Sequence, residues 1–318
     1  IQVGDMMAFI TYTMEIVMSF LFFTFLMMQL PRAEVAVGRI NEVLETEVTV
    51  VDSENIDDSK LQDVKGTLKF DNVSFTFDGA DSPVLSNISF EAEAGKTTAI
   101  IGSTGSGKST LLHLIPRYFD ASEGEISIDG VNIRDISLNK LRDILGFVPQ
   151  KGVLFSGNIE SNIKFADENI TDEQMRKAAE IAQAMEFINE KEDKFNSEIS
   201  QGGSNVSGGQ KQRLSIARAL AKNPKILLFD DSFSALDYKT DVKLRKTLKE
   251  KMKDTTTIIV AQRIATILHA DKIIVMNEGR VVGEGKHKEL LSSCPTYLEI
   301  AESQLSEEEL AKGGNTHE

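Results

Sequence analysis

The chain has 318 residues, of which 41% are hydrophobic and 26% charged; this composition allows a packed core and excludes general disorder. The formal net charge of −14 argues against a nucleic-acid partner, which would require a basic patch. A single cysteine, Cys294, excludes an internal disulfide and fits a reducing compartment. Because the first residue is Ile1 rather than Met, we expect an N-terminal portion that precedes it.

The most apolar stretch covers residues 6–30. Its length of about 25 residues suits a membrane-spanning helix, and no basic segment precedes it as in a signal peptide. Pro31 and Arg32 close the stretch, and the basic residues Arg32 and Arg39 predict that this end faces the cytoplasm. Glu15 interrupts it, and this carboxylate either faces a bundle interior or wet cavity, or lies near an interface and is solvated. One helix cannot form a transport path, so we expect partner helices outside this chain.

Two segments, residues 32–66 and 303–318, lie on either side of the central part of the chain. Residues 33–44 continue a helical pattern and residues 45–65 are acidic and polar, so residues 32–66 are predicted to be a helical extension and a linker. Residues 303–318 form a short acidic tail that we expect to be solvated.

From residue 67 the pattern alternates between strands and helices, which indicates a mainly parallel, helix-covered sheet with an antiparallel part near its start. Residues 151–222 are mostly helical and predict an inserted helical subdomain. The predicted strands are 68–77 with a bulge at Asp71-Asn72, 88–92, 98–101, 125–128, 146–148, 226–229, 256–260, 272–276 and 280–282, the last two joined by a hairpin turn. The predicted helices are 110–115, 138–143, 172–189, 209–221 and 239–253.

Between the strand at 98–101 and the helix at 110–115 lies a Gly-x-x-x-x-Gly-Lys-Ser pattern, in the strand–loop–helix context of a phosphate-binding loop. Glycines allow successive N–H groups to point at phosphate oxygens, and the helix N-terminus adds partial positive charge. Lys108 is expected to reach the β- and γ-phosphates of a nucleotide, and the Ser109 hydroxyl to bind Mg²⁺. The alternative is a merely flexible glycine loop.

The strand at 226–229 delivers Asp230 at its C-terminal end, where ligands bind in such sheets. We expect this carboxylate to hold Mg²⁺ directly or through water. A second glycine loop, Ser207-Gly208-Gly209-Gln210, opens a helix and is suited to phosphate as well. One nucleotide does not need two phosphate-binding loops from the same chain. We therefore expect a head-to-tail dimer in which this loop caps ATP on the other subunit. A plain helix cap is the alternative.

This Ser-Gly-Gly-Gln run downstream of a phosphate loop resembles the signature of ATP-binding cassette (ABC) transporters. The likeness extends from about residue 5 to about residue 300 and is closest to half-size exporters of the multidrug type, starting within their last membrane helix. It implies that residues 1–31 are this helix and residues 67–302 the nucleotide-binding domain. The implied fold is an α/β P-loop NTPase with a RecA-like core sheet, an antiparallel β-subdomain and the inserted helical subdomain.

The resemblance also implies roles for single residues. Phe77 matches the aromatic residue that stacks on adenine, where the family more often has Tyr, and Gln150 matches the glutamine that senses Mg²⁺ and links to the membrane domain. Residues 234–237 match the loop that crosses between subunits. The implied nucleotide-binding residues are Phe77, Gly102, Ser103, Thr104, Gly105, Ser106, Gly107, Lys108, Ser109, Thr110, Ser207, Gly208, Gly209 and Gln210. The implied metal-binding residues are Ser109, Gln150 and Asp230, and the implied catalytic residues are Asp231, Gln262 and Gln150.

Two of these residues depart from the family pattern at the γ-phosphate. The general base is normally Glu, whereas Asp231 is one methylene shorter, and a misplacement of about 1 Å can cost on the order of 100-fold in rate. A His normally contacts the γ-phosphate, whereas Gln262 is a neutral donor. A third difference is Gln201, near which the family usually has a Glu that contacts the membrane loops, so we expect altered coupling there.

With the phosphate loop intact, these departures resemble the subunit of a heterodimeric exporter that keeps ATP at a slowly hydrolysing site. The resemblance thus implies an ATPase with ATP and Mg²⁺, a second exporter subunit, a multi-pass location in the cell membrane with a cytoplasmic nucleotide domain, and export of a substrate such as a drug or lipid. Two alternatives stay open: a homodimeric exporter with non-standard catalytic residues, and a non-transport ABC ATPase that acts as a soluble switch.

Overall fold

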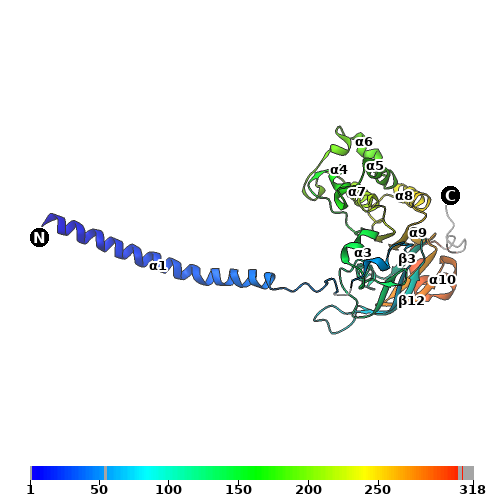
Figure 1. Cartoon of the computed structure of the whole chain (residues 1–318), viewed down its shortest axis with the longest axis horizontal. Helices are drawn as coiled ribbons and strands as arrows, with labels where there is room; N and C mark the ends of the chain where they lie inside the picture. Colours follow the sequence, from blue (N-terminus) through cyan, green and yellow to red (C-terminus); the bar gives the residue numbers. More distant parts are fainter. Residues whose placement is uncertain (1, 54–55, 307–309, 311–318) are drawn as a thin grey trace. The chain divides into compact units, whose positions relative to one another are not determined.

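A computed structural model describes residues 2–53, 56–306 and 310 of the chain, which divides into two units, Ile1–Thr49 and Val50–Glu318. The first unit contains one helix, α1 (Val3–Leu44), of 42 residues (Figure 1). Pro31 lies inside α1 without ending it, so the helix continues through the predicted end of the apolar stretch.

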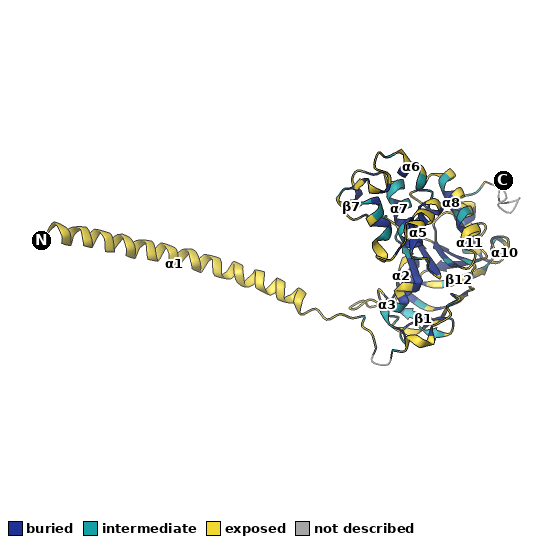
Figure 2. Ribbon diagram, turned by 45° about the horizontal axis from the view of Figure 1, so that its top comes forward, coloured by how far each residue is buried: buried dark blue, intermediate teal, exposed yellow. Residues whose placement is uncertain are grey.

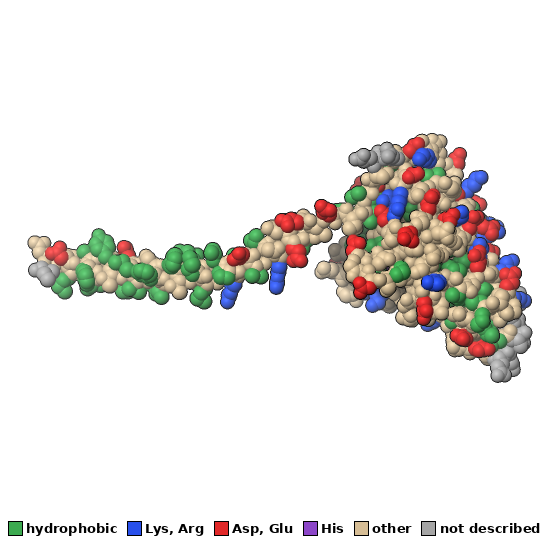
Figure 3. Space-filling model, turned by 90° about the horizontal axis from the view of Figure 1, so that it is seen from below, with side chains coloured by type: hydrophobic (Ala, Val, Ile, Leu, Met, Phe, Trp, Pro, Cys, Tyr) green, Lys and Arg blue, Asp and Glu red, His purple; other side chains and the backbone are tan. Residues whose placement is uncertain are grey.

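The side chains of α1 are exposed along the whole helix, and Figures 2 and 3 show its exposure and its many apolar side chains. The hydroxyl groups of Thr11, Thr13 and Ser19 do not need water, because they donate to the carbonyl four residues earlier, at 2.9, 2.7 and 2.8 Å. Within the described part of the chain, α1 is the one helix that is long and apolar enough to cross a membrane. The predicted long apolar helix at the N-terminus is confirmed.

The second unit is built on a six-stranded sheet in the order β12-β11-β3-β10-β9-β6. Neighbouring strands run parallel except β12, which is antiparallel to β11. This arrangement confirms the mainly parallel sheet. Its strands are β3 (Thr97–Gly102), β6 (Leu145–Val148), β9 (Ile226–Asp230), β10 (Thr256–Val260), β11 (Lys272–Asn277) and β12 (Arg280–Gly285).

An antiparallel sheet in the order β2-β1-β4-β5 forms from the early part of this unit, as predicted. The register of β1 shifts between Phe70 and Val73, which confirms the predicted bulge, but β1 ends at Phe75 and leaves Phe77 in the following loop. Its strands are β1 (Leu68–Phe75), β2 (Leu85–Ala92), β4 (Glu123–Ile128) and β5 (Val131–Asn132), and a separate pair consists of β7 (Gly157–Asn158) and β8 (Glu198–Ile199).

Helices cover the sheets, and α4 to α7 group together in Figure 1, where the helical subdomain was predicted. The helices of this unit are α2 (Lys108–Leu114), α3 (Leu138–Ile144), α4 (Ile159–Ile163), α5 (Asp172–Ile181), α6 (Met185–Glu190), α7 (Gly208–Ala221), α8 (Tyr238–Lys251), α9 (Ile264–Ile267), α10 (His287–Ser293) and α11 (Pro295–Glu302). Short 3-10 helices lie at Asp58–Lys60, Lys164–Ala166, Lys194–Asn196 and Gln201–Gly203.

The central strands are buried on both faces, which explains their continuous apolar runs. In β9, Leu227 and Phe229 point into the core cluster that includes the helical subdomain, whereas Leu228 points into the cluster shared with the antiparallel sheet. The alternation follows from the two-residue period of a strand. The sheet therefore divides the core into two layers, and its strand ends are fixed from both sides.

One predicted helix was wrong in extent. Residues 172–189 form two helices, α5 and α6, because Gln183 adopts a left-handed conformation with φ 56° that interrupts the helical hydrogen bonds. The short elements β5, β7, β8, α4 and α9 and the two C-terminal helices α10 and α11 were not predicted. The hairpin between β11 and β12 is as predicted, since Glu278 and Gly279 both have positive φ, at 46° and 74°.

The predicted acidic linker is partly attached to the second unit. The Asp52 carboxylate accepts the backbone N–H of Leu138 at 2.8 Å, and Asp58 accepts both the N–H and the hydroxyl of Ser137 at 2.8 Å. The backbone carbonyl of Val51 accepts from Arg117 at 3.1 Å. These contacts attach Asp52 and Asp58 to the start of α3, and Val51 to the segment after α2.

Candidate nucleotide-binding site

The loop between β3 and α2 has the backbone that its glycines predict. Gly105 and Gly107 take φ of 84° and 92°, values that side chains disfavour. A Cβ at Gly102 would lie 2.1 Å from the carbonyl oxygen of Met276, so β11 leaves no room for a side chain there. The loop therefore needs glycine at these three positions, and at its end α2 begins at Lys108.

Lys108 places a buried positive charge inside this loop. Its Nζ donates to the carbonyls of Gly102 at 2.8 Å and Ser103 at 2.7 Å, and to the Ser106 hydroxyl at 3.3 Å. Burial lowers the pKa of Lys108, while the carboxylates of Asp231 and Asp230 oppose this effect. Among the described residues Lys108 has no ion-pair partner within 4.0 Å, so its charge fits an anionic ligand such as a phosphate.

Asp230 ends β9 beside the first turn of α2. Its Oδ1 accepts the Ser109 hydroxyl at 2.8 Å, and its Oδ2 lies 3.9 Å from Nε2 of His113. A carboxylate and a hydroxyl that meet in this way supply the oxygen ligands that Mg²⁺ prefers, so these two side chains fit the expected metal. The contact with His113 was not predicted, since nothing in the spacing of the sequence singles out this residue.

Asp231 follows in a left-handed conformation, with φ 45°. Its backbone is fixed because its N–H donates to Val260 O at 2.9 Å and its carbonyl accepts the Ser234 hydroxyl at 2.7 Å. Its Oδ2 accepts from Nε2 of Gln262 at 2.9 Å and from Nε2 of Gln150 at 3.3 Å. The structure thus brings the three predicted catalytic residues together on one carboxylate oxygen. No hydrogen bond or ion pair of the described residues joins Gln150 to Asp230 or Ser109, its predicted partners at the metal.

The pKa of Asp231 reflects this environment. Burial raises it above its usual range, while the hydrogen bonds from Gln150 and Gln262 and the charge of Lys108 act in the opposite direction. A carboxylate with a raised pKa binds a proton more strongly than an ordinary one, which is what a general base requires.

Phe77 is the predicted adenine-stacking residue. It is 40% exposed and meets Phe75 and Phe119 edge to face, with ring centroids 4.7 and 5.3 Å apart. Phe119, from the segment after α2, is also exposed and was not predicted. Together the rings form a supported apolar surface that suits the face of a purine base.

The second glycine loop begins α7 in the helical subdomain. Ser207 caps this helix: its hydroxyl accepts the Gln210 N–H at 3.3 Å, and its own N–H donates to Gln210 Oε1 at 3.1 Å. Ser207 and Gly208 are exposed, and a Cβ at Gly208 would meet no atom within 4 Å. In the described parts of the chain no hydrogen bond or ion pair links residues 207–210 to residues 102–110.

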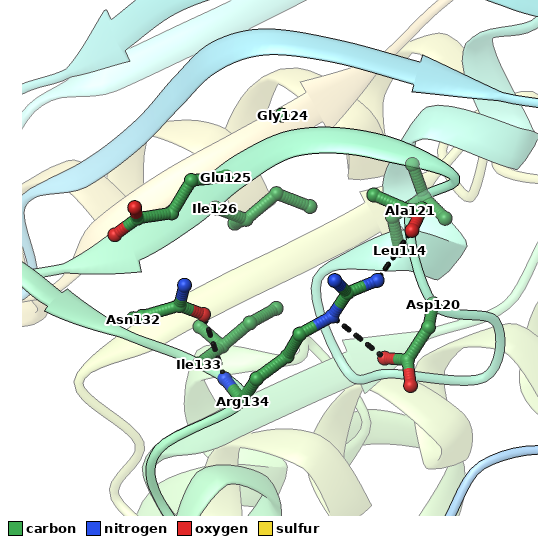
Figure 4. A pocket seen from close by; sticks show the side chains of 9 residues that line it. All are labelled: Leu114, Asp120, Ala121, Gly124, Glu125, Ile126, Asn132, Ile133 and Arg134. Atoms are coloured by element: carbon green, nitrogen blue, oxygen red, sulfur yellow. Dashed lines mark hydrogen bonds and ion pairs between the residues drawn. The ribbon is translucent and has the colours of Figure 1, made fainter.

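A small pocket elsewhere contains none of the predicted site residues. Figure 4 shows the Arg134 guanidinium inside it, donating to the carbonyl of Ala121 and 3.8 Å from Asp120. The Arg134 side chain lines this pocket, and none of the residues around Lys108 does. The lining residues are Leu114, Asp120, Ala121, Gly124, Glu125, Ile126, Asn132, Ile133 and Arg134.

The fold and the site together define a P-loop NTPase. The family model described as "ABC transporter" matches residues 85–234. The chain contains an ABC transporter ATPase domain, and the predicted fold class is confirmed.

Three ABC proteins illustrate what the chain is similar to, and the chain covers about half of each. An uncharacterized ABC transporter ATP-binding protein of Mycobacterium tuberculosis is 43% identical over 95% of the chain and 52% of that protein. An ATP-dependent lipid A-core flippase of Aliivibrio fischeri is 42% identical over 82% of the chain and 45% of that protein. The solved structure of a bacterial Atm1-family ABC exporter with ATP bound superimposes with a TM-score of 0.80 at 36% identity, over 87% of the chain and 48% of that structure. The chain thus spans about half the length of the curated relatives it matches.

Proposed function

We propose that this chain is the C-terminal part of one subunit of an ABC exporter, which couples MgATP binding and hydrolysis to the export of a substrate across a membrane. The observation that carries the proposal is the convergence of the buried Lys108, the Ser109–Asp230 pair and the Gln150–Asp231–Gln262 cluster at the C-terminal edge of the parallel sheet. The apolar helix α1 supplies the membrane part, and the exporter structure that matches most of the chain supports the same division. Residues 1–31 are then the last transmembrane helix and residues 67–302 the nucleotide-binding domain.

Each residue of the site has a task in this proposal. Lys108 and the N–H groups of the glycine loop bind the phosphates, Phe77 stacks on the base, and Ser109 and Asp230 hold Mg²⁺. The metal draws negative charge from the phosphates when it is bound. Asp231 orients a water and accepts its proton, and the amides of Gln150 and Gln262 hold the carboxylate in place.

We further propose that hydrolysis at this site is slow and that the partner is a different subunit. Asp231 is one methylene shorter than the usual Glu, and two amides hold the same carboxylate oxygen. Gln262 is neutral and cannot supply the cation that a His can. The loop Ser207–Gln210, exposed at Ser207 and Gly208, is open to a second subunit, whose site it would complete. The partner is expected to carry Glu and His at the matching positions.

The chain in its purified form is therefore expected to bind ATP and hydrolyse it very slowly. Fast ATP turnover by the chain alone, without a second subunit, would contradict the slow-site proposal. Native mass measurement of the full-length protein separates a heterodimer from a homodimer, which is the second candidate. The raised pKa of Asp231 supports the homodimer, because a general base must bind a proton. Membrane fractionation tests the location, in which α1 spans the cell membrane and the nucleotide domain faces the cytoplasm. The cargo, a drug or lipid in this proposal, is tested by transport into vesicles.

A further inference from the structure

The loop between β10 and α9 carries Gln262, and it is held from outside by a residue of the C-terminal segment. Nε2 of Gln304 donates to the backbone carbonyl of Gln262 at 2.8 Å, and its Oε1 accepts the backbone N–H of Ile264, also at 2.8 Å. One amide thus bonds the backbone on both sides of Arg263. We infer that Gln304 is a positioning residue of the nucleotide site, which sets where Gln262 meets Asp231.

The Ile264 N–H needs this bond, because it is the first N–H of α9. Helices leave their first N–H groups without partners, and a side chain at the preceding position often accepts one of them. Arg263 occupies that position and makes no such bond. The Oε1 of Gln304 therefore replaces the missing cap, and α9, with only four residues, depends on it.

Gln304 is itself fixed by contacts that do not involve the nucleotide site. Its backbone N–H donates to the carbonyl of Ala301 at 3.0 Å, and the N–H of Leu305 donates to the same carbonyl at 2.8 Å. Ala301 is fully buried at the end of α11, and the Leu305 side chain packs against the core. These contacts attach the C-terminal turn to the core, and the exposed Gln304 reaches the loop from it.

Only a side-chain amide of this length provides the donor and the acceptor that the loop requires. A glutamate at position 304 still accepts from Ile264, but it has no donor for the carbonyl of Gln262 and places a negative oxygen against it. The loop then shifts, and Nε2 of Gln262 moves away from Oδ2 of Asp231, to which it is now bonded at 2.9 Å. Geometry at such a site controls the rate steeply.

The two hydrogen bonds from the Gln304 side chain to the loop form a clamp, which amide hydrogen exchange tests without ATP turnover. In the full-length exporter, Gln304→Glu and Gln304→Leu are each expected to speed exchange in residues 262–268 about fivefold, the effect of losing about one hydrogen bond, and to leave β9 unchanged. The matched control is Gln62→Glu, which changes an exposed glutamine in the same way and should alter nothing at this loop. Unchanged exchange at 262–268 in both Gln304 variants overturns the clamp.

A double-mutant cycle tests whether the clamp acts through Gln262. This step rests on the proposed function, because its readout is ATP hydrolysis. In the purified chain alone, where no partner site contributes to turnover, Gln304→Glu is expected to lower kcat about fivefold with KM for ATP unchanged, and to have no further effect in a Gln262→Ala background. Independent, multiplicative losses in the two variants overturn the positioning role even if the exchange result holds. Fast wild-type turnover by the chain alone contradicts the slow-site proposal but leaves both Gln304 tests readable.

Discussion

The two sides of the nucleotide site differ in how much freedom their residues have. On one side, the phosphate loop and Asp230 follow directly from β3 and β9, and Lys108 is buried among backbone carbonyls of its own loop. On the other side, Asp231 depends on amides from two separate loops, one of which depends on Gln304. In the proposed function, phosphate binding thus relies on residues that directly continue two strands of the core sheet, whereas hydrolysis relies on side chains from separate loops. A chain can lose the second property and keep the first.

The largest effect is expected at the phosphate loop. Lys108→Ala removes the buried charge and should weaken ATP binding by about 100-fold or more, in line with the loss of a charge-assisted contact at a buried site. Equilibrium binding of a fluorescent ATP analogue measures this loss. The matched control is Lys96→Ala, an exposed lysine that pairs with Glu93 and should leave affinity unchanged. Equal affinity of Lys108→Ala and the wild type would contradict the assignment of the site.

The second prediction concerns the hydrolytic side. Asp231→Glu combined with Gln262→His restores the usual reach and the ionisable donor, and should raise ATP turnover at this site by on the order of 100-fold. Phosphate release by the reconstituted exporter is the measurement, with ATP affinity as the control because Lys108 is untouched. No gain in turnover would show that these two residues do not limit the rate.

The third prediction compares how a Gly→Ala substitution in each of the two glycine loops changes the free energy of unfolding. Gly102→Ala places a Cβ 2.1 Å from Met276 O and should lower the free energy of unfolding by about 1–3 kcal/mol, as overpacking does. Gly208→Ala meets no atom within 4 Å and should change it by less than about 0.5 kcal/mol. Denaturant unfolding of the two variants is compared with the wild type. Similar losses in both would contradict the view that only the phosphate loop is confined by the core.

The smallest effect is expected from pH. Burial raises the pKa of Asp231, so its carboxylate takes up a proton at a higher pH than an exposed aspartate. Only the ionised form accepts a proton from water, so turnover should fall as pH is lowered through this raised pKa, and ATP binding should change less. The sign for stability is opposite: burial favours the neutral form, so the contribution of this group to stability is fully present below its ordinary pKa and is lost as pH rises through the raised pKa. An Asp231→Asn variant that keeps the same acid limb would assign the limb to another group.

The phosphate loop, Asp230 and most long strands could be predicted because each depends on residues close together in the sequence. The break at Gln183 could not, since a left-handed glutamine in an otherwise helical run has no local signal. Phe119 and Gln304 were also missed: their roles come from contacts with Phe77 and with Gln262, 42 positions away in each case. Asp231 and Gln262 were predicted from a family resemblance, but that they bind each other through one carboxylate oxygen required the structure.

The attachment of the acidic segment has a mechanical consequence. Six residues, 45–50, connect Leu44, the last residue of α1, to Val51, which bonds Arg117, so this connecting segment spans at most about 25 Å. A separation of Leu44 from Val51 that is longer than this must either detach Val51 and Asp52 from their partners or unwind the end of α1. The carboxylates of Asp58 and Asp52, which bind Ser137 and Leu138, thus set the length of the connecting segment. Beyond that length, force on the segment acts directly on the residues that begin α3.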